Sequence, residues 1–76
     1  MVHAFVMVDA ATGEAETTLS AIRDLAGVTE AHVVAGDVDL IAELETDEVY
    51  DVLRTASAEI QRLSGVTETR TYVALD

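Results

Sequence analysis

One six-residue pattern occurs twice in this chain and divides it into two similar halves. Leu25–Glu30 reads LAGVTE, and Leu63–Glu68 reads LSGVTE. In each copy an apolar helix end is followed by a glycine that can end the helix and by the first residues of a strand. The repeat therefore predicts two strand–helix–strand halves, which constrains the fold more than any other feature of the sequence.

Hydrophobic periodicity gives the remaining elements. Gly27 and Gly65 are expected to end the two helices, and Thr46 is expected to be the N-cap of the second. Strands are predicted over Val2–Asp9, Val28–Ala35, Leu40–Glu45 and Val66–Leu75, and helices over Glu14–Ala26 and from Thr46 to about Leu63. With right-handed crossovers, this βαββαβ order predicts an α+β, ferredoxin-like sandwich. Its antiparallel sheet has the strand order 4-1-3-2, and both helices cover one face.

The first predicted strand is apolar on both faces. Ala4, Val6 and Val8 alternate with Phe5 and Met7, so the strand is expected to be central in the sheet. Two helices on one face would leave the second apolar set in water, which usually marks an interaction surface. The chain is only 76 residues long and has no cysteine, so oligomerisation is its remaining route to a larger buried core. We therefore expect a sheet-to-sheet dimer.

The charge of the chain is strongly negative. Fifteen acidic residues against four arginines give a formal net charge of −11. This charge argues against direct nucleic-acid binding and against anionic membrane surfaces. It is typical of a salt-adapted, halophilic cytoplasm, and an ordinary acidic protein is the alternative. No export signal and no apolar run of membrane-spanning length is visible, so a cytoplasmic location is expected.

Few residues suggest catalysis or metal binding. His3 and His32 are expected on strands that a third strand separates, and there is no cysteine or close His/carboxylate cluster to complete a metal site. They are interpreted as structural or interface histidines. Ser57 lacks the glycine-flanked elbow of a serine hydrolase. We therefore predict no enzyme activity, no metal and no cofactor.

Two groups of polar residues allow either a structural or a binding interpretation. Asp37 and Asp39 flank a predicted hairpin connection, where aspartate commonly satisfies backbone donors, but either carboxylate could receive the ammonium group of a small ligand. Thr69 and Thr71 share one face of the last strand. Threonine is a good strand residue, and such a row of hydroxyls could also bind a ligand's polar head.

The sequence resembles a known family over essentially its whole length. Val28–Leu40, which contains the Gly36-Asp37-Val38-Asp39 hairpin, resembles the effector-binding domain of Lrp/AsnC regulators, and Gly65–Val73 resembles the last strand of that domain. The resemblance implies a single ligand-binding domain over residues 1–76, an αβ-barrel-type sandwich dimer, and often a larger ring. It also implies amino-acid effectors bound between dimers near the hairpin. By position, the implied ligand-binding residues are Gly36, Asp37 and Asp39, with Thr69 and Thr71 as further candidates.

The resemblance also suggests how such a chain would act. Family members carry an N-terminal helix-turn-helix, whereas this chain begins at the first strand of the effector domain. It therefore resembles a stand-alone sensing and oligomerisation module that regulates transcription through full-length Lrp/AsnC partners. Two alternatives share a similar topology, namely an ACT-type amino-acid-binding domain and a small dimeric αβ-barrel enzyme of the monooxygenase type. The glycine–aspartate hairpin favours the first interpretation, and no acid/base pair or cofactor motif supports an enzyme.

Overall fold

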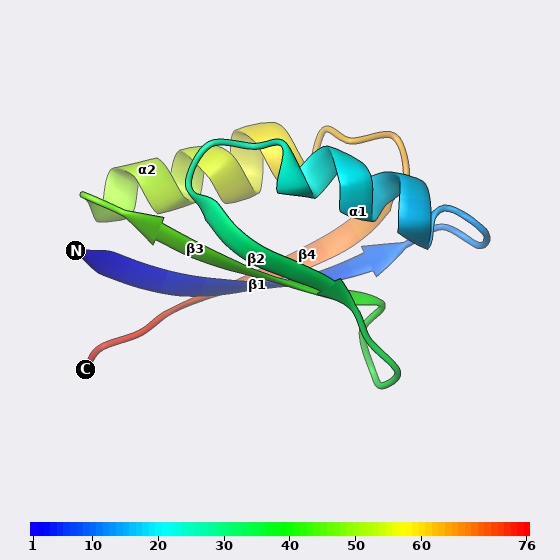
Figure 1. Cartoon of the computed structure of the whole chain (residues 1–76), viewed down its shortest axis with the longest axis horizontal. Coiled ribbons are helices and arrows are strands. Elements are labelled where there is room, and N and C mark those ends of the chain that lie inside the picture. The colour runs from blue at the N-terminus through cyan, green and yellow to red at the C-terminus, as the bar shows by residue number, and fades with distance from the viewer.

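A computed structural model describes all residues from Met1 to Asp76, and it shows four strands with the helices lying on one side of them (Figure 1). The elements in chain order are β1 (Val2–Ala10), α1 (Ala15–Arg23), β2 (Val28–Val33), β3 (Leu40–Thr46), α2 (Val49–Leu53), the π-helical segment η1 (Arg54–Ile60) and β4 (Val66–Val73). Neither helical stretch is long and apolar enough to cross a membrane.

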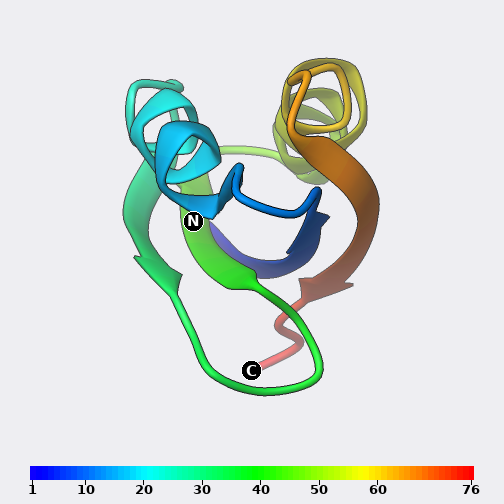
Figure 2. The same cartoon turned by 90° about the vertical axis from the view of Figure 1, so that its right-hand side faces the viewer.

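The strands form one antiparallel sheet in the order β2-β3-β1-β4. This is the predicted ferredoxin-like order read from the other edge, so that prediction is confirmed. β1 is central, and Val6 lies between Ala42 of β3 and Thr71 of β4. The sheet curves around the helices, whereas the β2–β3 connection projects away from them (Figure 2).

The core lies between the helices and one face of the sheet, here called the covered face. Alternate strand residues are fully buried there, as the period-two pattern predicts. The sheet contributes Ala4, Val6, Val8, Ala31, Leu40, Ala42 and Leu44, and the helices contribute Ile22, Val52, Ala56 and Ile60.

The predicted bounds of the second helix are wrong. Thr46 is the last residue of β3, and its hydroxyl donates to the Glu48 carbonyl, while Glu48 holds the N-cap position. The helix continues in π geometry and ends at Ile60. The fully buried residues Val52 and Ile60 and the buried Ala56 are spaced by four along this helical stretch, and Leu53 at the end of α2 is half exposed.

The two glycines of the repeat do not end the helices as predicted. α1 ends at Arg23, and Gly27 lies beyond it in the turn before β2 with φ of +90°, a conformation that favours glycine. Gly65 is buried and does not have positive φ. A Cβ atom there would collide with the Thr18 hydroxyl of α1. The repeated glycine thus has two different roles. Gly27 adopts the positive φ of a turn, and Gly65 lets the loop before β4 pack closely against α1.

Two strands are shorter than predicted. β2 ends at Val33, and beyond it a hydrogen bond from the Val34 amide to the Asp39 carbonyl, at 2.9 Å, closes the hairpin. β4 ends at Val73, after which the Ala74 amide bonds to His3 and the chain leaves the ladder. Both differences lie at element ends, where pattern-based bounds are least determined.

Candidate functional site

The β2–β3 hairpin is held against the sheet by Asp39. The Asp39 carboxylate accepts a hydrogen bond from the Ala10 amide at 2.8 Å. Its own amide donates to the Val8 carbonyl at 3.0 Å, and its carbonyl closes the hairpin by accepting from Val34. Asp39 therefore performs the backbone-satisfying role open to a turn aspartate, and it fixes the hairpin to the end of β1.

The tip of the hairpin, unlike Asp39, is not bonded to the sheet through its side chains. Gly36 and Asp37 are exposed, and the Asp37 carboxylate makes no hydrogen bond or ion pair within the chain. A Cβ atom at Gly36 would meet nothing within 4 Å. Val38 between the aspartates is partly buried. The tip thus presents one unpaired carboxylate beside open backbone, fixed in place by its anchored neighbour Asp39.

The two threonines lie on the other side of the sheet from the hairpin tip. Thr69 pairs with Val8, and Thr71 pairs with Val6, so both belong to the covered face. The Gln61 side-chain amide donates to the Thr69 hydroxyl at 2.8 Å. Gln61 and Thr69 both contribute to a hollow of about 250 Å³ that opens between the end of η1 and the edge strand β4, and its lining is Gln61, Val66, Thr67, Glu68 and Thr69.

A single chain does not bring the five predicted residues into one pocket. Asp39 and Thr69 flank Val8 from opposite sides, one through a hydrogen bond and the other through strand pairing. Two strand spacings amount to about 10 Å. The hairpin tip also projects away from the helices (Figure 2), whereas the threonines lie on the helix side. Gly36 and Asp37 line none of the hollows in the surface.

The face of the sheet opposite the helices, here called the open face, combines an apolar centre with paired charges. Its residues are His3, Phe5, Met7 and Asp9 of β1, Glu30 and His32 of β2, Ile41, Glu43 and Glu45 of β3, and Glu68, Arg70 and Tyr72 of β4. Glu30 and Glu43 are directly opposite each other, which is unfavourable for like charges. Each of these carboxylates lies about 3 Å from a histidine ring nitrogen, Glu30 from His32 at 3.0 Å and Glu43 from His3 at 3.1 Å. The predicted separation of the two histidine strands is confirmed, since β3 lies between them.

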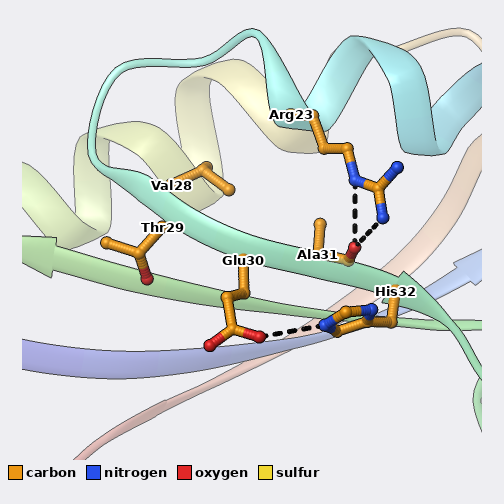
Figure 3. Close-up of a pocket in the computed structure, with 6 residues that line it drawn as sticks. All are labelled: Arg23, Val28, Thr29, Glu30, Ala31 and His32. Atoms are coloured by element: carbon orange, nitrogen blue, oxygen red, sulfur yellow. Dashed lines mark hydrogen bonds and ion pairs between the residues drawn. The ribbon is translucent and has the colours of Figure 1, made fainter.

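A second hollow, of about 240 Å³, runs along the edge strand β2 (Figure 3). Two nitrogens of the Arg23 guanidinium donate to the Ala31 carbonyl, Nε at 3.1 Å and Nη2 at 2.7 Å. The Glu30–His32 pair points away from Arg23, on the other side of the strand. The polar groups that line this hollow therefore point in different directions. The main effect of Arg23 is to bond the Ala31 carbonyl at the sheet edge, which another strand could otherwise bond.

Sequence reasoning missed the roles of Arg23 and Gln61. Each lies at a helix end that is not where the pattern placed it, so the contact of each with a strand could not be foreseen. The Glu30–His32 pair did have a signal, since residues two apart on a strand share a face. No group of three or more His, Cys, Asp or Glu side chains is placed to hold a metal ion.

Comparison with known proteins identifies related molecules. The model of a family described as the Lrp/AsnC ligand binding domain matches residues 3–76. The leucine-responsive regulatory protein of Haemophilus influenzae is 32% identical over 57 residues, which is 75% of this chain and 34% of that protein. The chain thus spans about a third of the length of this curated relative.

Solved structures agree with this match. The Thermus thermophilus protein TTHA0845 superposes with a TM-score of 0.95 at 29% identity, covering 100% of this chain and 95% of that one. The Neisseria meningitidis transcriptional regulator NMB0573, solved as its L-Met complex, superposes with a TM-score of 0.86 at 14% identity and shares the fold. That match covers 99% of this chain and 50% of that one.

Proposed function

Because this chain belongs to the Lrp/AsnC ligand-binding domain family, we propose that it is an amino-acid-sensing and assembly module in transcription regulation. The observation that carries the proposal is the hairpin tip, where the unpaired Asp37 carboxylate stands beside the open backbone of Gly36. An amino-acid ligand is supported by the Neisseria meningitidis regulator of the same fold, which was solved with L-Met.

The hairpin suits a zwitterionic ligand. Asp37 receives the ammonium group, and Asp39, whose Oδ2 is engaged by the Ala10 amide, offers its second carboxylate oxygen. Backbone donors near Gly36 receive the ligand carboxylate, and the absence of a side chain there lets the ligand approach. A charge-assisted hydrogen bond to a carboxylate contributes about 1.5–3 kcal/mol.

A complete site requires more than one chain. The open face has an apolar centre in Phe5, Met7 and Ile41 and pairs with the open face of a second copy, giving a sheet-to-sheet dimer. In a larger ring, a neighbouring dimer covers the exposed hairpin tip and excludes water from the ligand. Thr69 and Thr71 then act from another copy, since within one chain they lie away from the tip.

Access to DNA goes through other proteins. A net charge of −11 opposes contact with phosphates, so full-length Lrp/AsnC regulators in a mixed assembly supply the DNA contact. The module works without catalysis and without a cofactor, in the cytoplasm with its partners. The match to a regulatory protein of Haemophilus influenzae supports this role in regulation.

Calorimetry on hairpin variants tests the proposal. A thermal-shift screen of the twenty amino acids in high salt first selects the effector. Asp37→Asn should then weaken its binding ten- to a hundredfold, the equivalent of about 1.5–3 kcal/mol. Asp24→Asn is the matched control, because Asp24 is an exposed aspartate at the end of α1. Light scattering checks that each variant keeps the parent's assembly.

Two results would count against the proposal. If Asp37→Asn and Asp39→Asn both bind the effector as tightly as the parent, the ligand site lies elsewhere. If no amino acid stabilises or binds the parent, the sensing function is wrong, and the domain serves assembly alone.

A further inference from the structure

Three exposed apolar side chains lie together at the start of α2. Val49 is 47% exposed, Tyr50 69% and Leu53 50%. Residues three and four apart are neighbours on a helix surface, so Leu53 adjoins both of the others. We call these three residues the α2 patch. Their neighbour Val52 is fully buried, so α2 contacts the core there while the three patch side chains remain accessible.

The α2 patch is bordered by acidic groups. Asp47 and Glu48 are exposed directly before it, and neither side chain makes a hydrogen bond or ion pair. Asp51 lies 3.6 Å from Arg54, so the one nearby cation is already paired. An apolar centre with a charged rim is the usual layout of a protein interface, and here the rim is negative.

The surroundings exclude two occupants. The α2 patch is on the helix layer, on the opposite side of the sheet from the open face, so sheet-to-sheet pairing leaves it uncovered (Figure 2). A second copy packed patch against patch would bring its own Asp47 and Glu48 against this rim, and the nearby Arg54 is already paired with Asp51. An anionic membrane surface is repelled for the same reason.

The negative rim of the α2 patch favours a positively charged partner. We propose that the α2 patch binds a segment of another protein that carries apolar side chains flanked by lysine or arginine. The apolar side chains pack on Tyr50 and Leu53, and the cations meet Asp47 and Glu48. Tyrosine is among the residues that most often dominate binding energy at interfaces, and opposite charges at the rim favour encounter and set specificity.

Three synthetic helical peptides of one length test the proposal against the parent protein. The first has a leucine face with lysine flanks, the second keeps the leucines but has glutamate flanks, and the third has lysine flanks but serine in place of leucine. At about 0.15 M salt, where the Debye length is about 8 Å, the first peptide should bind at least tenfold more tightly than the other two. Its amide chemical-shift changes in the protein should centre on residues 49–54.

Protein variants complete the test. Tyr50→Ser combined with Leu53→Ser should weaken the first peptide at least tenfold, and Tyr50→Ser alone, at the most exposed position of the patch, should weaken it severalfold without risk to the fold. Leu75→Ser, at an exposed apolar position outside the strands and helices, should leave binding of the first peptide unchanged. Asp47→Lys with Glu48→Lys should transfer the preference to the glutamate-flanked peptide. Equal binding of the serine peptide, or shift changes centred on the open face, would overturn the proposal.

Discussion

The two faces of the sheet are made by the same strands, yet they differ in what covers them. On the covered face Val6, Leu40 and Leu44 are completely buried beneath the helices. On the open face Phe5 and Met7 are only partly buried, and Tyr72 is 52% exposed. Folding of one chain therefore uses only one of two apolar faces. This difference is the basis of the proposal that the second face contacts another molecule.

Truncating one β3 side chain on each face should give the largest contrast between the faces. Leu44→Ala removes a fully buried side chain and should cost about 2–5 kcal/mol of unfolding free energy. Ile41→Ala, on the partly exposed open face, should cost less than half as much. Urea unfolding measures both in a Phe5→Glu background, because this added open-face carboxylate should keep the chain monomeric and remove the contribution of assembly to apparent stability. Equal losses would show that the open face contributes to the fold of the chain as much as the covered face does.

A smaller effect is expected where α1 meets the loop before β4. Gly65→Ala places a methyl group against the Thr18 hydroxyl and should destabilise the fold by about 1–3 kcal/mol. Gly36→Ala is the control, because its Cβ would enter open space, and it should stay within about 0.5 kcal/mol of the parent. Thermal unfolding by circular dichroism compares the two. An unchanged melting temperature for Gly65→Ala would mean that Thr18 moves aside freely and that this helix–loop contact is not tight.

Much of the fold could be predicted because strand alternation has a strong local signal and because right-handed crossovers restrict the strand order. The alternation of Ala4, Val6 and Val8 with Phe5 and Met7 identified the central strand and its two apolar faces. The second helix was harder, because a π-helix leaves no simple mark in an α-helical periodicity. The spacing of Val52, Ala56 and Ile60 by four fits either geometry, so the sequence pattern does not separate them.

The candidate site could be predicted only in its parts. The hairpin between Val34 and Asp39 follows from turn residues, and one of the two roles considered for Asp39, bonding to backbone, is the one that the structure shows. Which aspartate remains free depends on the approach of Ala10 and Val8 from β1, a contact between distant parts of the chain. Periodicity along one strand also could not show that Thr69 faces the helices while the hairpin tip points the other way.

If the open face is an assembly surface, the mass of the protein in solution should exceed that of one chain. Light scattering in molar salt should give the parent at least twice the chain mass of 8.1 kDa. Phe5→Glu places a further carboxylate between Glu43 and Tyr72 on the open face. This variant should scatter as a folded monomer with an unchanged circular dichroism spectrum. A parent that remains at 8.1 kDa across micromolar concentrations would contradict the claim.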